Sequence, residues 1–136
     1  MLPYSGVNTI RARFNQARQR MSKVTIYHNP RCSKSRQTMA LLEENGVTPE
    51  IRLYLEEPPS SEELASVISK LGITPRALLR KGQAEYQTMN LADESLSDED
   101  IIDAMVKAPI LIERPIVIKE EQARLGRPPE QILDIL

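Results

Sequence analysis

The chain contains one cysteine, Cys32, and one histidine, His28, which lie four residues apart in the segment His-Asn-Pro-Arg-Cys-Ser-Lys-Ser-Arg at 28–36. An apolar run precedes this segment and a helical pattern follows it, so Cys32 is expected at a turn between a strand and a helix. Unpaired backbone N–H groups at a helix start favour a thiolate. Nearby cations have the same effect, and the segment supplies Arg31, Lys34 and Arg36. The pattern therefore indicates a reactive sulfur in surroundings that attract anions.

The residues that follow Cys32 narrow the type of thiol chemistry. A dithiol oxidoreductase would carry a second cysteine three positions later, where this chain has Ser35. An oxidised or adducted Cys32 must therefore be reduced by a thiol of another molecule. A phosphatase-type cysteine loop would need an arginine six positions beyond the cysteine, and Thr38 stands there. One cysteine and one histidine are too few for a zinc site, so no bound metal is expected.

Three arginines outside this segment stand at breaks in the chain, and two of them directly precede a proline. They are Arg80, Arg114 and Arg127. Arginine stays charged and presents a planar fork of donors that suits tetrahedral oxyanions, so convergence of the three on Cys32 would create an oxyanion pocket. The alternative is that they are solvated surface residues, and spacing alone leaves both readings open.

The Arg114–Pro115 pair stands directly before an apolar run. Proline cannot donate a backbone hydrogen bond, so Pro115 is expected at the start of a strand. A bond between any residue and proline is also the usual place for a cis peptide. A cis bond at Pro115 would turn the backbone toward the cysteine loop, and we state it as a hypothesis that a structure tests.

Composition predicts one compact domain. The chain has 136 residues, 40% of them hydrophobic, and no run approaches the length needed to cross a bilayer, so no membrane partner is expected. A single cysteine excludes an internal disulfide, which fits a cytoplasmic location. Residues 1–20 hold four arginines and no acid, which leaves an acidic remainder in a chain of net charge −1. Because nucleic-acid binding needs a basic surface, no nucleic-acid partner is expected.

Residues 1–20 also lack strand or helix periodicity, so they are predicted to be a disordered extension, with residues 21–136 forming the folded domain. An arginine-rich transit peptide would have a similar composition and is the alternative.

The hydrophobic pattern alternates between strand and helix. It predicts a strand over 23–28, a helix over 33–45, a strand over 51–55 and a helix that Ser60 and Glu63 open with a capping box. Two strands joined by a crossover helix should be parallel. A helical middle follows, with Thr74 capping a short helix and further helices over 86–91 and 97–107. Residues 110–112, 116–118 and 123–125 are predicted strands, and 129–136 a closing helix.

From Lys23 to the C-terminus the sequence resembles the glutaredoxin-coupled bacterial arsenate reductases. The matching segments are Tyr-His-Asn-Pro-Arg-Cys-Ser-Lys-Ser-Arg at 27–36, Leu-Tyr-Leu-Glu-Glu-Pro-Pro-Ser at 53–60, Arg-Ala-Leu-Leu-Arg-Lys at 76–81, Pro-Ile-Leu-Ile-Glu-Arg-Pro-Ile-Val at 109–117 and Gly-Arg-Pro-Pro-Glu at 126–130. The resemblance implies an α/β, thioredoxin-like fold. It also implies a mixed sheet of about four strands with flanking helices, a helical insertion in the middle, and a cis peptide at Pro115.

The same resemblance implies that Cys32 is the catalytic nucleophile and that His28 and Ser35 tune its thiolate. It assigns oxyanion binding to Arg80, Arg114 and Arg127. The implied reaction reduces arsenate to arsenite through an arseno-thiol adduct on Cys32, which glutathione as co-substrate and glutaredoxin then resolve. No bound cofactor is implied, and the partners are arsenate, glutathione and glutaredoxin.

Two other functions remain open at this point. Spx-like regulators share the cysteine region and bind RNA polymerase, which would make this chain an interaction protein. A glutathione-dependent reductase of a substrate other than arsenate would use the same thiol. The presence of an arginine at each of the three positions favours the arsenate-reducing enzyme over the regulator.

Overall fold

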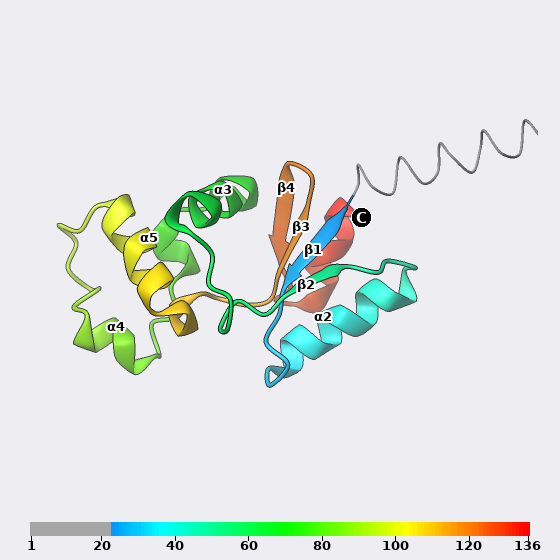
Figure 1. Cartoon of the computed structure of the whole chain (residues 1–136), viewed down its shortest axis with the longest axis horizontal. Coiled ribbons are helices and arrows are strands. Elements are labelled where there is room, and N and C mark those ends of the chain that lie inside the picture. The colour runs from blue at the N-terminus through cyan, green and yellow to red at the C-terminus, as the bar shows by residue number, and fades with distance from the viewer. Residues whose placement is uncertain (1–22) are drawn as a thin grey trace, which may run out of the picture.

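The computed structural model describes residues 23–136, and the predicted extension over 1–20 lies outside the described residues. Within this range a four-stranded sheet has the order β2-β1-β3-β4 (Figure 1). The strands are β1 (Val24–Tyr27), β2 (Glu50–Arg52), β3 (Ile116–Lys119) and β4 (Gln122–Leu125). Strands β1 and β2 are parallel, whereas β1–β3 and β3–β4 are antiparallel. The mixed thioredoxin-like sheet and its parallel first pair are therefore confirmed.

Alternating side chains of the strands build a core on each face of the sheet. Val24, Ile26 and Val117 pack in one cluster with α2 (Ser33–Glu44) and the 3₁₀ helix η3 (Pro129–Ile135). Their neighbours in the strands, Tyr27 and Ile116, belong to a second cluster on the side of the helical middle. Tyr27 at the end of β1 pairs with Ile116 at the start of β3, so the turn that leads into α2 and the residues before β3 lie at the same end of the sheet.

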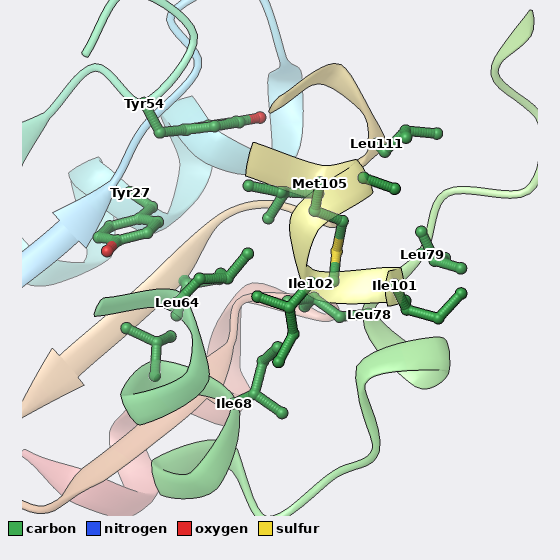
Figure 2. Packing of buried hydrophobic residues seen from close by; sticks show 14 of the residues in the cluster. Tyr27, Tyr54, Leu64, Ile68, Leu78, Leu79, Ile101, Ile102, Met105 and Leu111 are labelled. Atoms are coloured by element: carbon green, nitrogen blue, oxygen red, sulfur yellow. The ribbon is translucent and has the colours of Figure 1, made fainter. Parts of the chain in front are cut away.

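The helical middle comprises α3 (Ser61–Leu71), η1 (Pro75–Leu78), α4 (Ala84–Thr88), α5 (Asp98–Lys107) and η2 (Pro109–Leu111). Figure 2 shows apolar side chains of α3, among them Leu64 and Ile68, facing Ile102 and Met105 of α5. No helix among residues 23–136 is both long and apolar enough to cross a membrane.

Predicted helix caps are present at Thr74, whose Oγ1 accepts from Ala77 N at 3.2 Å, and at Ser60, whose Oγ accepts from Glu63 N at 3.1 Å. The predicted capping box at Ser60 is only half formed, because the Glu63 carboxylate bonds instead to Arg52 and to the Tyr27 hydroxyl. Glu63 therefore ties the start of α3 to strands β1 and β2, which is a tertiary role that the local motif does not reveal.

One strand prediction is wrong, and a second extends past the end of the strand that forms. Residues 110 and 111 lie in η2 rather than in a strand, and Ile112, directly after η2, pairs only in an isolated bridge with Leu79. Pro109 opens that helical turn, and the run buries Leu111 and Ile112 in the helical core. The predicted strand 51–55 ends at Arg52, because a turn follows in which Leu53 O accepts from the amides of residues 56 and 57.

Two helix predictions are displaced or altered. The predicted helix 86–91 runs from Ala84 to Thr88, with Gln83 at the N-cap position but without a side-chain cap hydrogen bond. Asn90 adopts a positive φ of 53° beyond the end of this helix. The closing segment 129–136 is a 3₁₀ helix rather than an α-helix, and it opens with Pro129.

Gly126 is the tightest glycine position in the fold. A Cβ added there would lie 2.4 Å from Thr38 Oγ1 and 2.8 Å from Pro115 Cγ. We expect Gly126→Ala to lower the free energy of unfolding by about 1–3 kcal/mol, the cost of overpacking a filled interior. Urea denaturation measures this change. Gly82→Ala is the matched control because a Cβ there meets nothing within 4 Å, and equal stability of the two variants would contradict close packing at Gly126.

Candidate active site

Cys32 is the N-cap residue of α2, with extended backbone angles of φ −96° and ψ 125°. Its amide donates to Asn29 O at 3.0 Å, and its carbonyl accepts from Arg36 N at 3.0 Å as the helix begins. Asn29 Oδ1 accepts from Arg31 N at 3.0 Å and closes the turn. The strand-to-helix turn predicted from the sequence is therefore confirmed, and it places the sulfur, which is nearly buried, at the helix start.

The pKa of the Cys32 thiol is lowered from its ordinary value. Burial by itself raises this pKa, but the backbone N–H groups of Ser35 and Lys34 and the positive charge of Arg114 outweigh it. Amide groups and a cation both stabilise negative charge on sulfur, so the environment favours the thiolate. The side-chain charge that lowers this pKa most comes from Arg114, far away in the sequence, whereas the contribution of Lys34 is its amide. Arg80 also interacts electrostatically with Cys32.

His28 and Ser35 lie together behind the cysteine turn. His28 Nδ1 and Ser35 Oγ are 2.6 Å apart and share a hydrogen bond, and the same hydroxyl accepts from Asn29 N at 3.0 Å. Ser35 is fully buried. Burial and then the charge of Arg36 lower the pKa of His28, which favours the neutral imidazole. The Ser35 hydroxyl thus holds the turn, while the same residue acts on the sulfur through its amide.

The three arginines expected to bind an oxyanion converge in the structure on one atom, Glu113 Oε1. The distances to this oxygen are 2.8 Å from Arg114 Nη1, 3.8 Å from Arg127 Nε and 4.0 Å from Arg80 Nε. The structure therefore brings together guanidinium groups that are widely separated in sequence. Arg114 and Arg80 both interact electrostatically with Cys32, so these two members of the cluster lie near the thiol.

Three backbone hydrogen bonds create this convergence. Arg80 N donates to Leu111 O at 2.8 Å and Glu113 N donates to Leu78 O at 2.9 Å, so the segment after η1 runs alongside the segment after η2. Gly126 N donates to Pro115 O at 2.9 Å, which sets Arg127 next to Arg114. The Arg114–Pro115 bond is cis, as the resemblance implies, and the Arg127–Pro128 bond is also cis.

Sequence reasoning missed two residues of this cluster, Glu113 and Tyr54. The available signal was the position of Glu113 directly before Arg114, but a carboxylate is not an expected component of an anion site. Tyr54 is fully buried, and its hydroxyl and Arg114 Nε are the buried side-chain atoms without a hydrogen-bond partner among residues 23–136. Burial raises the pKa of Tyr54 to about 12, so its hydroxyl stays protonated and remains a donor.

The Tyr54 ring is positioned by stacking. Its centroid lies 6.2 Å from that of Tyr27, with 17° between the planes, and Figure 2 shows the two hydroxyls at different ends of the pair. The Tyr27 hydroxyl bonds to Glu63. The Tyr54 hydroxyl has the charges of Cys32, Arg80, Arg114 and Glu113 around it, so it borders the arginine cluster.

As for metals, the described part of the chain holds no group of three or more histidine, cysteine, aspartate or glutamate side chains arranged to bind an ion. The chemistry open to the site is that of a thiolate of lowered pKa beside a cluster of three arginines. A model of the ArsC family matches residues 27–135. The chain belongs to the ArsC family.

Several known proteins and solved structures match most of the chain. An "Uncharacterized protein YfgD" of Escherichia coli K12 is 54% identical over 84% of this chain and 97% of its own length. A protein of Escherichia coli named arsenate reductase is 49% identical over 85% of this chain and 82% of its own length. The solved structure titled "Arsenate reductase from Vibrio cholerae" has 52% identity and a TM-score of 0.82, covering 85% of this chain and 98% of that one.

Proposed function

We propose that this chain reduces arsenate to arsenite, with Cys32 as nucleophile and Arg80, Arg114 and Arg127 as the oxyanion-binding groups. The observation that carries the proposal is the placement of three guanidinium groups around one point beside a thiol of lowered pKa. Relatives named arsenate reductase are 48–49% identical to this chain over most of its length, which supports the same activity.

The first step is attack by the Cys32 thiolate on the arsenic of bound arsenate. An S–As bond forms and one As–O bond breaks, so hydroxide leaves and takes up a proton from solvent. Arsenic is still pentavalent in this adduct. The arginines carry the negative charge of the oxyanion through charge-assisted hydrogen bonds, and the Tyr54 hydroxyl is a further donor at the edge of the cluster.

The second step transfers two electrons to arsenic. Glutathione thiolate attacks the sulfur of Cys32, the S–As bond breaks, and its electron pair leaves with arsenic, which protonates to arsenite. The product on the protein is a mixed disulfide between Cys32 and glutathione. A glutaredoxin thiol then attacks the glutathione sulfur and returns Cys32 as thiolate. Both electrons come from external thiols, so the reaction as written uses no bound cofactor, and its need for reduced glutathione suits the cytoplasm.

The test is arsenite formation in a reconstituted reaction of the chain, arsenate, glutathione and a glutaredoxin. We expect repeated turnover only when all four are present. Without glutaredoxin, the mixed disulfide between Cys32 and glutathione stops the reaction after about one arsenite per chain, because the chain has one cysteine and cannot supply the resolving thiol itself. Chromatography coupled to arsenic detection measures the product, and glutathione with glutaredoxin alone gives the background. No arsenite above that background in the complete reaction would reject the proposed function.

A further inference from the structure

Glu113 places a negative charge at the centre of the arginine cluster. Its Oε1 is within hydrogen-bond distance of Arg114 Nη1 and within 4.0 Å of the other two guanidinium groups. The same oxygen accepts from Arg114 N at 3.2 Å, and the Glu113 amide is bonded to Leu78 O. Backbone hydrogen bonds at Glu113 and Arg114 thus fix the position of the carboxylate. The Glu113 side chain is about three-quarters buried, at 26% exposure.

A carboxylate in an anion site has a selective effect on the anion. An ionised carboxylate accepts hydrogen bonds and cannot donate them. Arsenate and phosphate keep at least one hydroxyl near neutral pH, and this hydroxyl can donate to the carboxylate. Sulfate carries no proton there, so its oxygens would face the carboxylate as a second acceptor of like charge. Such an arrangement binds one anion and disfavours the other by leaving acceptors unpaired.

We propose that Glu113 is a specificity-determining residue that restricts this site to tetrahedral oxyanions that carry a proton. Its carboxylate accepts the hydrogen bond of the substrate hydroxyl, while Arg80, Arg114 and Arg127 bind the remaining oxygens. Arg114 Nε, a buried donor without a partner among the described residues, is available for one of these oxygens. The inference rests on the proposed function to the extent that both require an oxyanion beside Cys32.

The test compares phosphate with sulfate, because the two are tetrahedral and of similar size and neither is reduced by a thiol. Calorimetric titration of the full chain near pH 7, at constant ionic strength, measures each dissociation constant. We expect the wild type to bind phosphate about 10- to 100-fold more tightly than sulfate, the effect of one hydrogen bond to a charged group.

Glu113→Gln removes the charge but keeps the shape, and its amide N–H can donate to sulfate. We expect the two dissociation constants of this variant to lie within about threefold of each other, mainly because sulfate binds more tightly. Glu113→Asp retains a carboxylate and should keep a preference for phosphate. Glu121→Gln is the matched control, since Glu121 is exposed in the turn between β3 and β4 and should leave the preference unchanged.

Three results would overturn the inference. They are equal binding of the two anions by the wild type, an undiminished phosphate preference in Glu113→Gln, and loss of both anions by a Glu113→Gln variant that circular dichroism shows to be folded. The last would mean that Glu113 only holds the arginines together. Should that variant not fold, the preference of the wild type and of Glu113→Asp decides the matter.

The same experiment separates this inference from the proposed function. A wild type that prefers phosphate to sulfate but forms no arsenite would retain the selectivity of Glu113 and reject arsenate reduction. A wild type that forms arsenite and binds phosphate and sulfate equally would retain the reductase and reject the role of Glu113. The inhibition of arsenite formation by each anion provides an independent reading of both dissociation constants.

Discussion

Cys32→Ser is expected to lower the rate of arsenite formation by at least about 10⁴-fold, the scale of effect seen when a catalytic nucleophile is removed. A serine hydroxyl is not ionised near pH 7 and cannot form the S–As bond from which the electron pair is transferred. Steady-state arsenite formation with glutathione and glutaredoxin in excess measures the loss.

The same variant has a built-in control for folding. Cys32 occupies the N-cap position of α2 without a side-chain cap hydrogen bond, and serine is a preferred residue at an N-cap. The free energy of unfolding should therefore stay the same or rise slightly, which urea denaturation checks. A folded Cys32→Ser variant that retains more than about a hundredth of the wild-type rate would contradict a covalent mechanism at this sulfur.

Arg114→Gln is expected to have the second largest effect, a fall in kcat/KM of about 10²- to 10³-fold, comparable to the loss of one preorganised donor in an anion site. The change removes a guanidinium group from the oxyanion cluster and also the charge that lowers the pKa of Cys32. The pKa of the thiol should therefore rise, and the fraction of thiolate at pH 7 should fall. Arg114→Lys keeps a charge but lacks the planar fork, so it should recover thiol reactivity more than kcat/KM.

The rate of Cys32 alkylation by iodoacetamide as a function of pH reports this change without any arsenate. We expect the midpoint of the profile to move to higher pH in Arg114→Gln. Arg31→Gln is the informative contrast, because Arg31 is adjacent to Cys32 in sequence but exposed, and its charge is not among the causes that lower the thiol pKa. A larger shift in Arg31→Gln than in Arg114→Gln would contradict the electrostatics of the site.

Local features of this protein were predictable from the sequence because their signals lie within a few residues. The position of Cys32 follows from an apolar run, a proline turn and a helical pattern in direct succession. Helix starts at Ser60, Thr74 and Ser97 follow from side chains that accept the amide three residues later. The parallel β1–β2 pair follows from the length of the helix between the strands. The positions of the arginines at chain breaks were also visible, whereas their convergence was implied only by the family resemblance.

Only the tertiary structure decided which charges meet at the sulfur. Sequence proximity pointed to Arg31, Lys34 and Arg36 as the cations beside Cys32, whereas the structure places Arg114 there with Glu113 among the arginines. Pairing between the segments after η1 and η2, and between β1 and β3, sets these neighbours. Such contacts join residues dozens of positions apart and leave no periodic trace along the chain. Residues 110–112 show the same limit, since an apolar run fits a strand or a buried helical turn equally well until its packing partners are known.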